Sequence, residues 1–329
     1  MSNSQKIKNI GVLTSGGDAP GMNAAIRAVV RACMYYELEC TGIFRGYDGM
    51  IDGDYKKLHV RSVSKILGRG GTVLKSARSM GFMTKEGRQK AFENLQERGI
   101  DALITIGGNG TFTGAHIFQE EFGIPIIGIP GTIDNDLFGT DNTIGFDTAC
   151  NTVVEAVDKI RDTANSHNRL FFVEVMGRDA GFIALRSGIA TGAIAIMLPE
   201  EEMSIDGLID VLEKGAASNK TSSIVIVAEG DANGGAYEVA QKVNAKYSHY
   251  ETKVTVLGHI QRGGSPSHWD RVLASRMGVA AVEGLVNGKS DAMIGVINDK
   301  DEFTPFLEAI SKKAMPNKEE LRIAKILSI

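Results

Sequence analysis

The segment from residue 9 to residue 23, NIGVLTSGGDAPGMN, constrains the fold of this chain more than any other stretch. Its apolar run at residues 10–13 predicts a buried strand, which stops at Gly16 and Gly17 before a helical pattern begins near Pro20. Glycine lets the backbone approach an anion closely, and the free amides and positive dipole end of the following helix face that anion. The segment therefore predicts an anion-binding turn between a strand and a helix.

A second turn of the same kind follows the apolar run in residues 101–111, DALITIGGNGT. The chain holds 39 glycines in 329 residues, which is about 12% against a usual value of roughly 7%. The excess lies in loops at the ends of expected strands rather than in a low-complexity tract. Two glycine-rich turns of this type indicate a site for a polyphosphate.

Strand and helix patterns alternate along most of the chain. Strands are expected at residues 10–13, 40–44, 102–106, 124–129, 170–175, 193–198, 223–227 and 254–259. Helices are expected at residues 23–36, 62–67, 88–97, 112–120, 148–164, 182–190, 205–215, 269–286 and 317–329. This repetition indicates parallel strands, with ligands at their carboxyl ends. Because 329 residues exceed what one core usually serves, we expect an α/β fold with two similar three-layer α/β/α lobes, mainly parallel sheets and an active site in the cleft between them.

Composition excludes several classes of function. The net charge of −4 gives no basic footprint for nucleic acid. No apolar run approaches the roughly 20 residues needed to span a bilayer, and the first nine residues are too polar for a signal peptide. The three cysteines, Cys33, Cys40 and Cys150, form no CxxC pair, which favours buried, reduced thiols. We therefore expect a cytoplasmic protein.

The segment at residues 130–136, PGTIDND, carries two carboxylates, Asp134 and Asp136. On an extended strand end, residues spaced i, i+2 project to the same side. Phosphoryl transfer needs a carboxylate that accepts the proton of the attacking hydroxyl and a neighbour that orients it or helps to hold magnesium. Taken alone, the segment is also compatible with a solvated turn rich in Asp and Asn. The two glycine-rich turns upstream favour the catalytic interpretation.

Over residues 7–315 the chain resembles the ATP-dependent 6-phosphofructokinases of bacteria. The matching motifs are LTSGGDAPGMN at residues 13–23, PGTIDND at 130–136, MGR at 176–178 and GHIQRGGSP at 258–266. Each motif is long, and they occur in the family's order. Together they are highly specific, whereas a lone GGxGT turn would be weak.

The resemblance implies a role for each matching residue. Asp134 would be the general base that deprotonates the 1-hydroxyl of fructose 6-phosphate, with Thr132, Asp136 and Arg178 around the transferred phosphoryl group. The residues implied to bind ATP are Gly17, Tyr47, Arg78, Ser79, Gly108, Asn109, Gly110 and Thr111. Those implied to bind the sugar phosphate are Thr132, Ile133, Asp134, Arg169, Met176, Gly177, Arg178, Glu229, Lys253, His259 and Arg262. Arg169 and Lys253 would reach in from a neighbouring subunit of a homotetramer.

Three departures from the family pattern are expected to matter. Asn109 stands where the family usually has an aspartate that positions Mg²⁺, so the metal would rely on Asp134 and Asp136 together with a neutral amide oxygen. Lys253 stands where an arginine normally reaches the sugar phosphate, and lysine keeps the charge but loses the bidentate fork. An effector site is only half present. Its arginines match at Arg27, Arg31 and Arg161, but its other positions hold Val60, Lys65 and Ile194.

The resemblance also suggests the donor and the lobes. Pyrophosphate-using relatives carry an aspartate at the position of Gly110 and a lysine at the position of Gly131, so glycine at both positions favours ATP. We expect residues 1–144 and 260–311 to form an ATP-binding lobe, and residues 145–259 and 312–329 to form a sugar-phosphate-binding lobe. The partners implied are ATP and fructose 6-phosphate, with no nucleic acid and no membrane.

Three other functions are compatible with parts of the sequence. An NAD kinase also has a GGDGT-like turn, but it lacks the segments at 130–136 and 258–266. A nicotinamide dehydrogenase would need G-x-G-x-x-G after the first strand, where this chain has none. A weakly catalytic, regulatory relative that binds sugar phosphate without turnover is favoured by Asn109. Without the motifs, Arg169 and Arg178 would be ordinary surface ion-pair residues, and His259 would merely cap a strand.

Overall fold

A computed structural model describes residues 7–164, 169–218 and 223–327 of the chain. They form two compact units. Unit 1 comprises residues up to 132, 137–147 and 262–314, and unit 2 comprises residues 133–136, 148–261 and those from 315 onward. The chain thus passes between the units several times, and the short segment Ile133–Asp136, which carries both candidate carboxylates, belongs to unit 2.

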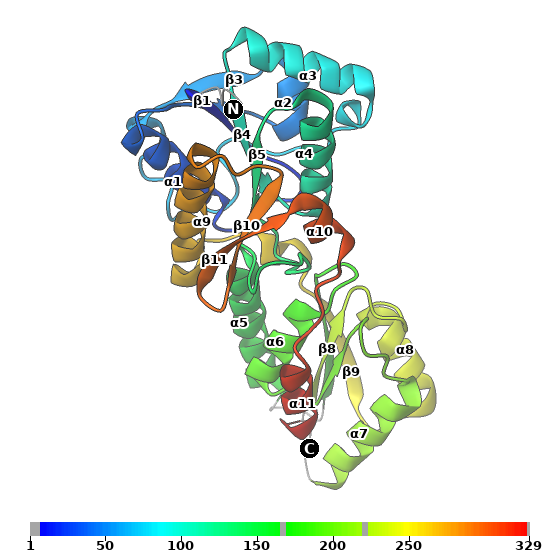
Figure 1. Cartoon of the computed structure of the whole chain (residues 1–329). Coiled ribbons are helices and arrows are strands. Elements are labelled where there is room, and N and C mark those ends of the chain that lie inside the picture. Colours follow the sequence, from blue (N-terminus) through cyan, green and yellow to red (C-terminus); the bar gives the residue numbers. More distant parts are fainter. Residues whose placement is uncertain (1–6, 165–168, 219–222, 328–329) are drawn as a thin grey trace. The chain divides into compact units, whose positions relative to one another are not determined.

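Unit 1 is built on a seven-stranded sheet in the order β11-β10-β5-β4-β1-β2-β3 (Figure 1). The strands are β1 Asn9–Thr14, β2 Glu39–Ile43, β3 Tyr55–Leu58, β4 Ala102–Gly107, β5 Ile126–Pro130, β10 Ala292–Ile297 and β11 Lys300–Pro305. The five central strands are parallel, and only the edge strands β3 and β11 pair antiparallel. Because parallel strands end at the same edge, the two glycine-rich turns after β1 and β4 and the segment after β5 are neighbours.

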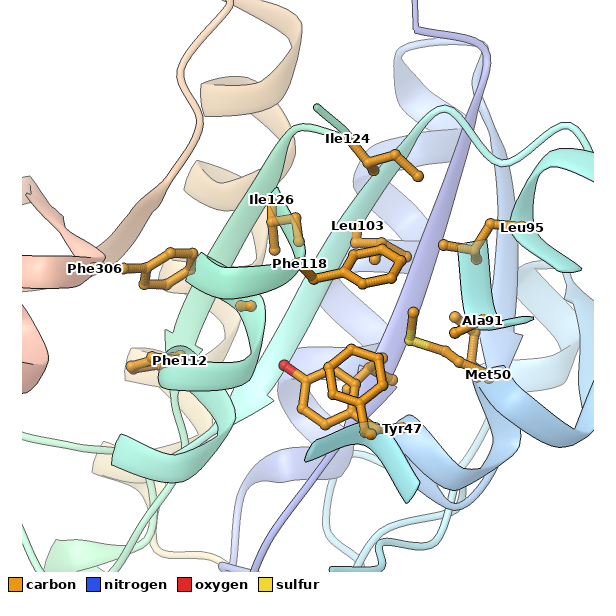
Figure 2. Packing of buried hydrophobic residues seen from close by; sticks show 14 of the residues in the cluster. Tyr47, Met50, Ala91, Leu95, Leu103, Phe112, Phe118, Ile124, Ile126 and Phe306 are labelled. Atoms are coloured by element: carbon orange, nitrogen blue, oxygen red, sulfur yellow. The ribbon is translucent and has the colours of Figure 1, made fainter. Parts of the chain in front are cut away.

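Helices cover both faces of this sheet. On one face, α1 Met22–Tyr35 packs against α9 His268–Val286, where Gly278 of α9 lies against Ala28 of α1. On the other face lie α2 Gly46–Asp52, α3 Lys85–Glu97, α4 Asn109–Phe122 and α10 Phe306–Ser311. Figure 2 shows side chains of these helices packed with those of the strands in one apolar cluster. Ile126 belongs to this cluster whereas Ile127 lies near Gly284 of α9, as alternation along β5 requires.

Unit 2 has a four-stranded parallel sheet in the order β7-β8-β6-β9. The strands are β6 Arg169–Val175, β7 Ala195–Met197, β8 Ser223–Ala228 and β9 Glu251–Val256. Helices α7 Ile205–Ala217 and α8 Ala236–Lys246 bury their apolar sides in the core on one face. Helix α6 Phe182–Thr191 lies against Ile196 on the opposite face and packs with α11 Lys318–Leu327. The long helix α5 Phe146–Ala164 starts in unit 1 and continues in unit 2.

The predicted α/β class with mainly parallel sheets is confirmed. The helix predicted at residues 62–67 is wrong: a short 3₁₀ turn covers Val60–Val63 and ends at Ser64, whose backbone is extended, and Lys65 has a left-handed φ of 59°. The strand predicted through residue 259 ends at Val256 and is followed by a 3₁₀ turn at Gly258–Arg262. The last two residues of the helix predicted at 317–329 lie outside the described residues.

The sequence analysis missed several elements, although β10 is a largely buried apolar run and α8 buries residues at helical spacing. Helices α2, α8 and α10 and strands β3, β10 and β11 were not predicted. Strands β3 and β11 are edge strands with charged, largely exposed residues, and charge is typical of edges that resist further pairing. Among the described residues, no helix is both long enough and apolar enough to cross a membrane.

Candidate active site

The first glycine-rich turn follows β1 and leads into α1. Gly16 has a left-handed φ of 82°, and Gly21 at the start of α1 has a φ of 110°. A Cβ atom at Gly17 would lie 2.7 Å from Nη1 of Arg262, so a side chain there would collide with the guanidinium. Arg262 also donates a hydrogen bond from Nη1 to the carbonyl of Asp18 at 3.3 Å. The sequence predicted Arg262 at the sugar 6-phosphate, and in unit 1 its side chain lies against this turn.

The second turn leads from β4 into α4 and is bonded to the first. Oγ1 of Thr111 donates to the carbonyl of Ser15 at 3.2 Å, and the amide of Ser15 donates to the carbonyl of Ile106 at 3.0 Å. A Cβ atom at Gly107 would lie 2.3 Å from Oγ1 of Thr111, so only glycine fits this crossing. The predicted ATP-site residue Tyr47 is buried, and its hydroxyl donates to the carbonyl of Thr111 at 2.5 Å. Burial also raises the pKa of Tyr47 far above its usual range.

The N-terminal turn of α4 is suited to an anion. Asn109 is the first residue of this 14-residue helix, and no acidic residue occupies its first turn. Helix N-termini present unsatisfied amides and a positive dipole end. Apart from its chain neighbours and the nearby backbone of α4, no heavy atom of the described residues comes within 4 Å of a Cβ atom built at Gly110. The second turn therefore combines amide donors with open space beside Gly110.

The third segment follows β5 and lies beside the second turn. The amide of Gly131 donates to the carbonyl of Gly107 at 3.0 Å, and a Cβ atom at Gly108 would lie 3.7 Å from that of Thr132. Thr132 is buried, and its carbonyl accepts a hydrogen bond of 2.6 Å from Oγ1 of Thr143. Unit 1 thus brings together three strand ends that the sequence singled out separately.

Beyond Thr132, the chain enters unit 2 with the two candidate carboxylates. Asp134 is only 3% exposed, whereas Asp136 is half-buried. Asn135 between them has a left-handed φ of 54°, so the prediction of an extended strand end through Asp136 is wrong. The alternation argument therefore does not apply to these two side chains. Instead, Oδ2 of Asp134 forms an ion pair with Nε of Arg178 at 3.5 Å, and the Arg178 side chain is 54% exposed.

Arg178 lies on a loop after β6 that two other side chains hold in place. Its φ is 53°, a left-handed conformation that costs a non-glycine residue about 1–2 kcal/mol. Oε1 of Glu229 accepts hydrogen bonds from the amides of Gly177 at 3.2 Å and Arg178 at 2.7 Å. The buried Gln261 accepts from the amide of Met176 at 3.2 Å. The sequence named Glu229 as a sugar-site residue but missed Gln261, although it lies inside the motif at 258–266.

The two cations that the sequence predicts to reach a neighbouring subunit, Arg169 and Lys253, share one carboxylate. Nε of Arg169 donates to Oε2 of Glu251 at 2.9 Å, and Nζ of Lys253 lies 2.6 Å from Oε1 of the same residue. The sequence singled out Arg169 and Lys253 but not Glu251. His259, also predicted at the sugar phosphate, is exposed in the 3₁₀ turn that follows β9.

The other predicted residues lie in separate places. Arg78 is exposed, and Oγ of the neighbouring Ser79 accepts a hydrogen bond of 3.2 Å from the amide of Phe82. Arg27 and Arg31 line a pocket of about 440 Å³ on α1 and α9. Burial, followed by the charge of Arg31, lowers the pKa of Arg27. Arg161 donates to the carbonyl of Thr191 in unit 2.

The predicted magnesium ligands are oxygen donors of the kind that Mg²⁺ prefers. Asn109 opens α4 in unit 1, and Asp134 and Asp136 follow Thr132 in unit 2. A different group, His116, Glu120 and Asp291, has ligand atoms within 4.8 Å of one another. There Nδ1 of His116 pairs with Oδ1 of Asp291 at 2.8 Å, a contact that ties α4 to the start of β10.

Comparison with known proteins agrees with this arrangement. The phosphofructokinase family model matches residues 9–285. The chain is 53% identical to "ATP-dependent 6-phosphofructokinase 2" of Bacteroides thetaiotaomicron over 323 residues, covering 98% of this chain and 99% of the relative. It is 54% identical to "ATP-dependent 6-phosphofructokinase 1" of Thermus thermophilus, covering 98% of this chain and 100% of the relative.

Solved structures give the same result. A phosphofructokinase from Saccharomyces cerevisiae superposes with a TM-score of 0.88 at 37% identity, covering 97% of this chain. This chain spans only 46% of the yeast chain's length. A pyrophosphate-dependent phosphofructokinase from Marinobacter aquaeolei has a TM-score of 0.83 at 22% identity, which shows the fold alone. The family match and the near full-length relatives show that this chain belongs to the phosphofructokinase family.

Proposed function

We propose that this chain is an ATP-dependent 6-phosphofructokinase. It transfers the γ-phosphoryl group of ATP to the 1-hydroxyl of fructose 6-phosphate and gives fructose 1,6-bisphosphate and ADP, the committed step of glycolysis. The names of its relatives from Bacteroides thetaiotaomicron and Thermus thermophilus support this activity. The single observation that carries the proposal is the buried carboxylate of Asp134, which pairs with Arg178 and lies on the segment that follows β5.

The donor is ATP, and unit 1 supplies its phosphate contacts. The amides at Gly17 and at the start of α4, from Gly108 to Gly110, face the phosphate oxygens, which suits the anion-binding character of helix N-termini. The amide of Thr111 donates to the carbonyl of Gly108 and closes this turn. The exposed Arg78 adds charge, and Ser79 and the buried Tyr47 support the surrounding backbone. The open space beside Gly110 leaves room for the nucleotide.

Asp134 acts as the general base. Its carboxylate takes the proton from the 1-hydroxyl, the freed oxygen attacks the γ-phosphorus, and the bond from that phosphorus to the bridging oxygen of ADP breaks. A cation 3.5 Å away stabilises the ionised carboxylate, which is the form that a base requires. As charge spreads over the transferred group, the guanidinium of Arg178 and the hydroxyl of Thr132 offset it.

Mg²⁺ fits the oxygen donors that these segments offer. Asp136 and Asp134 would hold it together with the amide oxygen of Asn109, and it would neutralise charge on the nucleotide's phosphates. Asparagine binds magnesium less strongly than aspartate, so this chain would need more free magnesium than a relative with aspartate at the same position.

Fructose 6-phosphate contacts residues of unit 2 and Arg262. Ile133, Met176, Gly177 and Glu229 line the sugar. His259 and Arg262 take its 6-phosphate group, with Arg169 and Lys253 from a neighbouring subunit. Because these two residues come from a neighbouring subunit, the enzyme acts as a homotetramer, and dilution to monomers should abolish turnover. Its compartment is the cytoplasm. Arg27 and Arg31 of unit 1 and Arg161 of unit 2 match the family's effector site, which is only half present in this chain.

A panel of donors against acceptors tests the proposal. ATP, GTP and pyrophosphate are each combined with several hexose phosphates, and ADP or phosphate release is followed. We expect turnover with ATP and fructose 6-phosphate, and a 10²–10⁴-fold loss of kcat in Asp134→Ala with little change in the KM for ATP. Tight binding of fructose 6-phosphate without turnover would favour a regulatory relative, and an active Asp134→Ala enzyme would refute the role of the base.

A further inference from the structure

One carboxylate bridges the two cations at the start of β6 and β9. Arg169 and Glu251 are register partners in the parallel pair, and Lys253 lies two residues further along β9. Oε2 of Glu251 accepts from Nε of Arg169 at 2.9 Å, while Oε1 lies 2.6 Å from Nζ of Lys253. Both oxygens of Glu251 are therefore engaged by groups that could otherwise bind an anion.

This group is open to solvent on the side of the sheet away from α8. The side chain of Asn244 on α8 donates from Nδ2 to Oγ1 of Thr252 at 2.7 Å, so Thr252 faces that helix. Alternation along β9 then places Glu251 and Lys253 on the opposite face. The side chains of Arg169, Glu251 and Lys253 are 25%, 55% and 43% exposed. A dissolved anion can reach all three.

We propose that Glu251 competes with the phosphate group of the sugar for Arg169 and Lys253, and that it thereby lowers the affinity for fructose 6-phosphate. The inference rests on the proposed function, in which Arg169 and Lys253 bind that phosphate. A carboxylate and a phosphate accept hydrogen bonds from the same donors. With Glu251 in place, two cations present a net charge of +1 to a dianion, and the phosphate displaces carboxylate oxygens as it binds.

The competition operates at neutral pH because Glu251 stays ionised. Its hydrogen bonds with Lys253 and then Arg169 lower the pKa of the Glu251 carboxyl to about 2. Lys253 strengthens this competition, because a lysine lacks the bidentate fork of an arginine and is less able to bind a phosphate and a carboxylate at the same time. Glu251 thus sets the sugar affinity without contacting the reacting atoms.

The test is Glu251→Gln, which keeps the size of the side chain and one acceptor oxygen but removes the charge. Each exposed ion pair changes an equilibrium constant by a factor of about 1.5–5. We expect the KM and the calorimetric Kd for fructose 6-phosphate to fall about 3–10-fold, with kcat and the KM for ATP within about twofold of the starting enzyme. Glu155→Gln is the matched control, since it removes an exposed carboxylate paired with Lys159 on α5. It should change none of these values.

Lys253→Met, which should raise the KM for the sugar, separates the possible outcomes. If Lys253→Met raises the KM while Glu251→Gln leaves it unchanged or raises it, the competitor role is refuted and the proposed function stands. If neither variant changes the KM or the Kd, the sugar phosphate does not bind at this group, and the inference fails with that part of the proposed function. The Kd needs no turnover, so it decides the question even for an enzyme without activity.

Discussion

Glu229 provides a sharp test of whether the geometry of Arg178 controls catalysis. One oxygen of its carboxylate, Oε1, accepts from the amides of Gly177 and Arg178 and so holds the loop on which Arg178 has its left-handed backbone. Glu229→Gln keeps the shape and an acceptor oxygen but removes the charge. We expect the loop to populate other conformations, because the left-handed conformation of Arg178 is itself unfavourable.

The size of the effect follows from the two hydrogen bonds. A bond to a charged group contributes about 1.5–3 kcal/mol and a neutral one about 0.5–1.5 kcal/mol. The 2.7 Å bond to the Arg178 amide should thus lose about 1 kcal/mol, and the 3.2 Å bond to the Gly177 amide about half as much. A total of about 1.5 kcal/mol corresponds to roughly a tenfold fall in kcat/KM.

The assay is steady-state ADP release at varied fructose 6-phosphate. Glu200→Gln is the matched control, because the carboxylate of Glu200 accepts from the amide of Gly181 at 2.9 and 3.1 Å, three residues beyond Arg178. A double-mutant cycle with Arg178→Ala should show that the two losses are not additive. Glu229→Gln activity within twofold of the starting enzyme, an equal loss in Glu200→Gln, or additive losses would each refute the reasoning.

Three further changes test other parts of the molecule. Asn109→Asp should lower the Mg²⁺ concentration for half-maximal activity several-fold, because a carboxylate binds magnesium more strongly than an amide; an unchanged titration would place residue 109 away from the metal. Gly110→Asp has room in the fold, so Tm should stay within about 2 °C, but the KM for ATP should rise at least about tenfold through repulsion and bulk; an unchanged KM would show that the nucleotide passes elsewhere. Phe118→Ala, at a fully buried ring of the cluster in Figure 2, should lower the free energy of unfolding by about 3–5 kcal/mol in urea denaturation. A midpoint unmoved from that of the exposed control Met83→Ala would contradict its place in the core.

The sequence predicted the parts of the fold whose signals are local. The apolar run before Gly16 became β1, and the run before Gly107 became β4, because buried parallel strands need continuous apolar residues. Strand β11, with the sequence KDEFTP, could not be predicted in this way, since an edge strand buries little and therefore carries little apolar pattern. The conformation of Asn135 was missed for a related reason: asparagine adopts both extended and left-handed backbone, and its neighbours decide which.

For the site, the sequence by itself determined which residue types are present and in what order: glycines after strands, a carboxylate at 134 and arginines at 169 and 178. Only the tertiary structure decided which of them meet. Glu229 holds the Arg178 loop from 51 residues away, and Glu251 reaches Arg169 across 82 residues because β6 and β9 pair in one particular register. Such contacts depend on strand order and register, which arise from the packing of the whole sheet and leave no mark in the residues on either side.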